Sequence, residues 1–151
     1  MSVARWLGTW FGCGLVPKAP GTAGSLGALP LYYLAIHFGG PWAHFIVMLL
    51  VCAVGVWASG AVADELGTKD PQIVVIDEVA GMLIALLPAT PSIASVVVAF
   101  VLFRVFDAGK PWPVSALERL PRGWGIMMDD VGAGILSALV IMLLRYTGAL
   151  S

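Results

Sequence analysis

Acidic residues occur three times in this sequence at the border between a polar segment and an apolar one. They are Asp77, Glu78, Asp107, Asp129 and Asp130. Ionisable groups at membrane depth are energetically costly, so a functional role is the first expectation for them. Carboxylates are also the ligands that Mg²⁺ prefers, together with water and substrate phosphate. These side chains could therefore form a magnesium site for phosphoryl chemistry.

Two other interpretations fit the same acidic residues. A carboxylate at a helix N-terminus interacts favourably with the helix dipole, usually by less than about 1 kcal/mol, so the pairs at 77–78 and 129–130 could be structural caps. Asp107 differs because it ends a predicted helix, where the dipole disfavours a negative charge. Intramembrane carboxylates also line the ion paths of small coupled transporters. An inverted repeat would favour a transporter, and we find no convincing one in this sequence.

A glycine-rich segment at 12–25 leads directly into an apolar helix. Backbone amides in such a turn at a helix N-terminus can hold an anion, and nearby hydroxyls and a lysine would assist. The candidate phosphate-binding residues are Lys18, Gly21, Thr22, Gly24 and Ser25. The alternative is a loop and helix start whose small residues allow close helix packing. The segment is not a Walker A loop, because no Gly-Lys-Ser/Thr follows.

Two other charged clusters are expected to have ordinary surface roles. Asp64 and Glu65 follow the longest apolar run and fit an exposed helix end, although they could join the site. The residues predicted to form a solvated loop facing lipid headgroups are Glu118, Arg119 and Arg122.

The apolar runs that must position these residues predict an all-α bundle of about five helical segments. Residues 42–63 are uncharged over 22 positions, and about 20 suffice to cross the hydrocarbon core. Residues 22–38 form an earlier segment, in which Pro30 predicts a kink or a half-buried entry into the membrane, and Gly39 and Gly40 form a turn after it. The remaining segments are 79–87, 93–106 and 131–144.

The segment between 79–87 and 93–106 decides the topology. Pro88 and Pro91 predict a turn, and Ser92 can cap the next helix. A hairpin returns the chain to the side of the membrane from which it came, so the polar segments share one face of the bundle. A single span would instead place their acidic groups on opposite sides of the membrane. With the hairpin, every Lys and Arg except Arg145 lies on that face, which the positive-inside rule makes cytoplasmic. We therefore predict a multi-pass membrane bundle whose polar loops converge on the cytoplasmic face.

The composition agrees with a membrane protein of one domain, residues 1–151. Apolar residues make up 60% and charged residues 11% of the chain, against about 45–50% and about 25% in soluble domains. The mean hydropathy is +0.95. The net charge of −1, without a basic stripe, excludes nucleic acid as a partner and leaves the lipid bilayer as the main environment.

Four short motifs follow one another along the chain. They are Pro-x-x-Pro-Gly-Thr-x-Gly-Ser at 17–25, Asp-Glu-x-x-Gly at 77–81, Phe-Arg-x-x-Asp-x-x-Lys-Pro-x-Pro at 103–113, and Gly-x-Gly-Ile-Met-x-Asp-Asp-x-x-Ala-Gly at 123–134. Each motif alone is weak, but four in this order are specific. They resemble the phosphatidylglycerophosphatase A family from about residue 8 to about residue 144. Gly109 replaces a residue that is often bulky in this family, which affects packing more than chemistry.

The resemblance implies a Mg²⁺-dependent enzyme that hydrolyses phosphatidylglycerophosphate, a membrane lipid, to phosphatidylglycerol and phosphate at a bacterial inner membrane. Our hypothesis is that Asp77, Glu78, Asp129 and Asp130 hold one or two Mg²⁺ ions. Asp107 would complete the metal site or act as general base. Arg104, Lys110 and the amides near 21–24 would bind the phosphoryl oxygens. Direct attack by water and a covalent aspartyl-phosphate are both compatible with this set, whose catalytic members are Arg104, Asp107, Lys110 and Asp130.

Overall fold

The computed structural model describes all 151 residues, and its only regular secondary structure is helical. Its α-helices are α1 (Val3–Gly8), α2 (Pro20–Leu66), α3 (Ile76–Ala85), α4 (Ile93–Gly109), α5 (Val114–Leu117) and α6 (Gly123–Tyr146). A short 3₁₀ helix, η1 (Cys13–Leu15), lies between α1 and α2. The predicted all-α fold class is confirmed.

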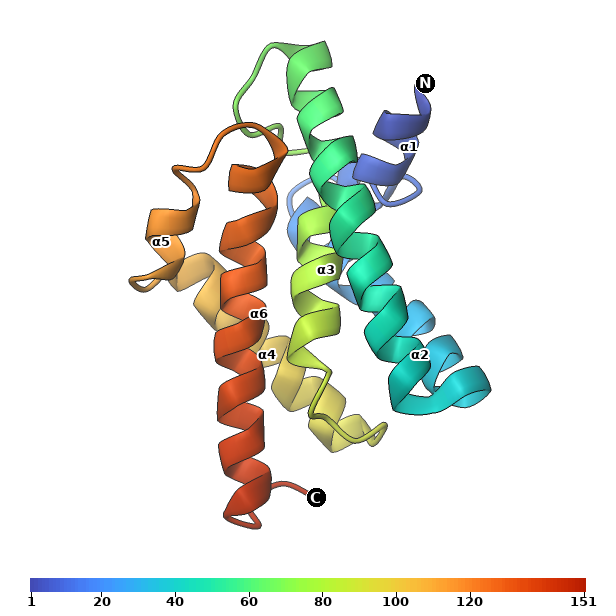
Figure 1. The fold of residues 1–151 in the computed structure, drawn as a ribbon, viewed down its shortest axis with the longest axis vertical. Coiled ribbons are helices and arrows are strands. Elements are labelled where there is room, and N and C mark those ends of the chain that lie inside the picture. The colour runs from blue at the N-terminus through green and yellow to red at the C-terminus, as the bar shows by residue number, and fades with distance from the viewer.

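The long helix α2 consists of two helices joined by a reversal of the chain. Gly40 has φ 67° and ψ −159°, a conformation that favours glycine, and Pro41 then begins the second half. Figure 1 shows the chain turning back at this point, so the two halves of α2 run in opposite directions. The predicted glycine turn is therefore present. The backbone dihedral angles stay helical through Pro30, so the break in α2 lies at Gly40 alone.

The predicted proline turn separates α3 from α4. Ser92 caps α4, since its hydroxyl accepts a hydrogen bond of 3.2 Å from the Ser95 amide. The Arg145 guanidinium near the end of α6 donates to the Pro88 carbonyl at 2.6 Å, which ties this turn to the C-terminal part of the chain. After the turn α4 runs back past α3 and α6 (Figure 1), so the end of α4 returns toward the level of the start of α3.

The helix α3 lies at the centre of the molecule, between α2 and α6 (Figure 1). Two glycines allow α3 and α6 to approach closely: the Cα of Gly134 faces the carbonyl group of Gly81. A Cβ atom at Gly81 would in turn overlap the Phe103 ring and the Asp130 carbonyl oxygen. Small residues at a crossing bring helix backbones together, here with the acidic start of α3 beside Asp130.

The predicted start of the last helix at residue 131 is wrong, because α6 begins at Gly123. Gly123 packs so closely on α2 that a Cβ atom there would overlap the Val56 carbonyl. Asp129 and Asp130 consequently lie in the second turn of α6, beyond the free amides of the helix N-terminus. The helix-cap interpretation therefore fails for this pair.

Two helices, α2 and α6, are long and apolar enough to cross a membrane. Large apolar side chains cover the outward surface of both helices, which suits lipid rather than water. Examples with at least half of their surface exposed are Leu50, Trp57, Leu139, Met142 and Leu143. The fold thus supports a membrane location.

Candidate active site

A polar cavity of about 320 Å³ lies where the start of α3, the end of α4 and the second turn of α6 meet. We call it the inner cavity. Its lining includes seven of the residues that the sequence analysis selected: Lys18, Asp77, Glu78, Asp107, Lys110, Asp129 and Asp130. Segments far apart in the sequence thus bring their charged groups to one place, as the convergent arrangement predicted.

Three carboxylates form the most compact part of the inner cavity. One oxygen each of Asp77, Glu78 and Asp130 lies within 4.8 Å of the others. Each of the three side chains also has a buried oxygen atom without a hydrogen-bond partner. A buried charge without a partner is strongly destabilising, and three adjacent carboxylates repel one another. The cluster therefore requires positive charge or protons to be stable.

A hard divalent cation fits this set of donors. The oxygen ligands, their short separation and their unsatisfied atoms match what Mg²⁺ or Ca²⁺ requires. Six carboxylates against two lysines line the inner cavity, so it would repel an anionic substrate without added positive charge. Asp77, Glu78 and Asp130 are the residues that could hold the ion.

Contacts from the N-terminal part of the chain fix the start of α3 and so the first two carboxylates. The Val75 amide, just before α3, donates to the Gly8 carbonyl at 2.8 Å. Gly14 in η1 lies against the Ile73 carbonyl, where a larger residue would not fit. Backbone contacts of this kind determine where Asp77 and Glu78 point. These contacts join segments that lie far apart in the sequence.

Arg104 and Asp107 form an ion pair beside the carboxylate cluster. The Arg104 guanidinium donates to one Asp107 oxygen at 2.7 Å, one turn apart on α4. The Cα of Gly21 lies next to this pair: a Cβ there would be 3.2 Å from an Arg104 nitrogen and 2.5 Å from a Glu78 oxygen. Glycine at the start of α2 thus leaves room for Arg104 next to Glu78.

Lys110 provides a fixed positive charge at the edge of the inner cavity. It follows α4 with φ 40° and donates to an Asp129 oxygen at 2.9 Å. Its ammonium group also forms an ion pair with Glu118. Partial burial opposes the charged form, but the two carboxylates outweigh this effect and raise the pKa of Lys110 above its ordinary value. Lys110 therefore stays protonated at physiological pH.

The structure brings only part of the predicted glycine-rich anion site to the cavity. Lys18 lines it and Gly21 adjoins the carboxylates, whereas Thr22, Gly24 and Ser25 do not line it. The buried Ser25 hydroxyl donates to the Gly21 carbonyl at 2.9 Å, and a Cβ at Gly24 would lie 2.7 Å from Val75. Close packing, the alternative interpretation, accounts for these contacts of Gly24 and Ser25.

Three residues near the site were not selected from the sequence. Asp70 and Gln72 line the inner cavity from the loop before α3. Their place in a polar segment directly before Asp77 and Glu78 is the sequence feature that could have indicated this role. Glu118 requires a correction: its side chain is 43% exposed, as a solvated loop predicts, yet it pairs with Lys110. No local pattern connects positions 110 and 118, so only the fold reveals this contact.

The acidic residues at the end of α2 lie outside the inner cavity. Asp64 pairs with Arg122, and Glu65 pairs with Arg5 at 3.4 Å. These side chains are partly to largely exposed, so the pairs contribute little to stability. The interpretation of Asp64 and Glu65 as an exposed helix end is confirmed.

An all-helical fold with two helices apolar enough to cross a membrane, and with carboxylates, an arginine and lysines gathered around one cavity, is the class of structure expected of a small membrane-associated enzyme that acts on a charged group. The chain belongs to the phosphatidylglycerophosphatase A family, whose sequence profile matches residues 6–145. The predicted family is thereby confirmed, and the protein is a phosphatase.

Curated relatives support this assignment over most of their length. Phosphatidylglycerophosphatase A of Escherichia coli K12 is 41% identical over 136 residues, covering 87% of this chain and 77% of the relative. The Haemophilus influenzae protein of the same name is 36% identical over 143 residues, covering 93% and 87%. A Bacteroides thetaiotaomicron protein, provisionally named a phosphatidylinositol-3-phosphatase, is 40% identical over 148 residues, covering 93% and 92%. No solved structure matches the chain. The names of these relatives lend no support to the transporter alternative.

Proposed function

We propose that this protein is a Mg²⁺-dependent lipid phosphatase that converts phosphatidylglycerophosphate to phosphatidylglycerol and inorganic phosphate. The observation that carries the proposal is the cluster of buried, unpartnered carboxylate oxygens on Asp77, Glu78 and Asp130. Arg104 lies beside Glu78, and Lys110 lines the same cavity. Family membership and two relatives named phosphatidylglycerophosphatase A support the choice of substrate.

In the proposed mechanism, Asp77, Glu78 and Asp130 would hold Mg²⁺, with Asp129 beside them. The ion, when bound, neutralises the phosphomonoester and makes water more acidic. Lys110 and Arg104 bind phosphoryl oxygens and stabilise the charge that develops in the transition state. Asp107 orients Arg104 through one oxygen, and its other oxygen would accept the proton of the attacking water. As the bond from that water to phosphorus forms, the bond from phosphorus to the glycerol oxygen breaks, and the proton held by Asp107 passes to the leaving oxygen of phosphatidylglycerol.

Phosphate release in the presence and absence of metal tests this function directly. Detergent-purified protein is expected to release phosphate from phosphatidylglycerophosphate, to lose that activity in EDTA and to regain it with Mg²⁺. Phosphatidic acid and phosphatidylinositol 3-phosphate are the comparison substrates, the second because of the Bacteroides relative. Full activity in EDTA would remove the metal from the mechanism. A higher kcat/KM on phosphatidylinositol 3-phosphate would reassign the substrate.

We further propose that the inner cavity faces the cytoplasm from a bacterial inner membrane, with the bundle crossing the bilayer. Cysteines at Lys69 and Arg119, in a chain lacking Cys13 and Cys52, should react with an impermeant thiol reagent from the cytoplasmic side only. A cysteine at Tyr146, which is 90% exposed at the far end of α6, should react from the opposite side. Labelling of positions 69 and 119 from different sides would contradict the convergent site.

A further inference from the structure

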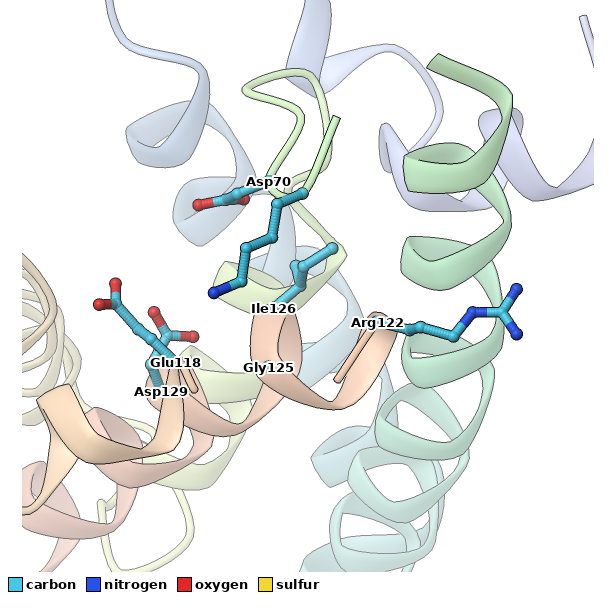
Figure 2. A pocket seen from close by; sticks show the side chains of 7 residues that line it. Asp70, Glu118, Arg122, Gly125, Ile126 and Asp129 are labelled. Carbon is cyan, nitrogen blue, oxygen red and sulfur yellow. The ribbon is translucent and has the colours of Figure 1, made fainter. Parts of the chain in front are cut away.

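Of the two carboxylates that contact Lys110, Asp129 lines the inner cavity and Glu118 does not. Lys110 lines the inner cavity, whereas Glu118 lines a second polar cavity of about 200 Å³, which we call the outer cavity (Figure 2). Asp70 and Asp129 line both cavities, so the two adjoin. The Lys110 ammonium, held between Glu118 and Asp129, therefore lies at their boundary.

The two partners of Lys110 differ in their exposure to water. The Asp129 side chain is 9% exposed and belongs to α6, while the Glu118 side chain is 43% exposed and directly follows α5. In Figure 2 both side chains lie at the same edge of the outer cavity. Lys110 is thus shared between a buried carboxylate of the site and a hydrated one outside it.

The backbone around Glu118 is fixed against α6. A Cβ at Gly125 would lie 3.0 Å from the Glu118 carbonyl oxygen, and a Cβ at Gly132 would lie 2.9 Å from the Leu117 side chain. These close contacts connect α5 with α6, the helix that carries Asp129. The separation of Glu118 and Asp129 is therefore set by packing, and both can hold one ammonium group.

We infer that Glu118 is a positioning residue, which keeps the Lys110 ammonium at the boundary of the inner cavity for contact with the substrate phosphate. Without Glu118, Lys110 would pair with Asp129 alone, and each would neutralise the charge of the other. With Glu118 present, the ammonium is shared, and Asp129 keeps part of its negative charge. The inference rests on the proposed function, since it requires Lys110 to contact a phosphoryl group.

Steady-state kinetics on phosphatidylglycerophosphate can separate this role from a structural one. Glu118→Gln should lower kcat about tenfold, because Lys110 is no longer held at the boundary of the inner cavity. It should not raise KM, because the same change removes a negative charge near the site that binds the anionic substrate. Glu118→Asp keeps the charge with a shorter reach, so its kcat should lie between the Gln variant and wild type. In a Lys110→Met background, Glu118→Gln should cause no further loss, because the residue it positions is gone.

Glu65→Gln is the matched control, because Glu65 is 41% exposed, pairs with Arg5 and lies outside both cavities. Its kcat should stay within twofold of wild type. The inference is overturned if folded Glu118→Gln keeps more than half of the wild-type kcat. It is also overturned if Glu118→Gln lowers the kcat of the Lys110→Met protein by the same factor as it lowers the kcat of wild type. Wild-type protein inactive on every lipid phosphate would instead refute the proposed function, and the inference with it.

Discussion

Replacing Asp130 by Asn is expected to lower the turnover number by a hundredfold or more. The change keeps the shape of the side chain and removes the charge from the cluster with Asp77 and Glu78. Losing about 2.7 kcal/mol of transition-state stabilisation corresponds to a hundredfold in rate. Asp130 lies in the second turn of α6, so loss of a helix cap does not explain such an effect. Phosphate release by purified protein at saturating lipid and Mg²⁺ measures it.

A second measurement on Asp130→Asn does not depend on activity. In EDTA the wild type keeps three crowded carboxylates with buried, unpartnered oxygens, and the variant has one fewer. We therefore expect the thermal unfolding midpoint of the variant in EDTA to exceed that of wild type, and the stabilisation by added Mg²⁺ to be smaller.

Asp64→Asn is the control for this experiment, because Asp64 is an exposed partner of Arg122 outside the inner cavity. Exposed pairs contribute about 0–1 kcal/mol, so the turnover of Asp64→Asn should remain near that of wild type.

The turnover number of Asp107→Asn should fall as far as that of Asp130→Asn, because Arg104 loses its partner and the attacking water loses its base. Folded Asp130→Asn and Asp107→Asn proteins that keep over half of the turnover, with unchanged Mg²⁺ dependence, would refute the assigned site.

Replacing Gly134 by Ala is expected to damage both stability and catalysis. The new methyl group would overlap the Gly81 carbonyl, a backbone group that cannot rotate away, so α6 and α3 must separate. Overpacking of this kind typically destabilises by about 1–3 kcal/mol. The same separation moves Asp130 away from Asp77, and a displacement of about 1 Å in a catalytic site can lower the rate about a hundredfold. Thermal unfolding in detergent and turnover of the folded fraction measure the two effects.

Gly109→Ala tests the same chemical change where the structure leaves space. Gly109 is the last residue of α4, and apart from its chain neighbours and the backbone of α4 no atom lies within 4 Å of a Cβ built there. Alanine favours helix over glycine by up to about 1 kcal/mol, so this variant should be at least as stable as wild type and equally active. A Gly134→Ala protein with wild-type unfolding temperature and turnover would show that close contact between α3 and α6 is not required.

The sequence alone predicted the features that depend on neighbouring residues. Long apolar runs predicted the helices, and the glycine pair at 39–40 and the prolines at 88 and 91 predicted the two reversals. Ser92 predicted the start of α4. The motifs also identified the family and five of the six carboxylates that line the inner cavity. These predictions succeed because helix formation, turn formation and side-chain chemistry are largely local properties.

Only the tertiary structure decided which of these groups meet and where the last helix begins. Gly123 starts α6 eight residues before the apolar run because it packs against the Val56 carbonyl of α2, a contact between distant segments. That early start places Asp130 beside Asp77 instead of at a helix end. The pairing of Glu118 with Lys110 has the same origin, because α5 packs on α6. Contacts between distant segments depend on how whole helices pack, and no spacing within one segment encodes them.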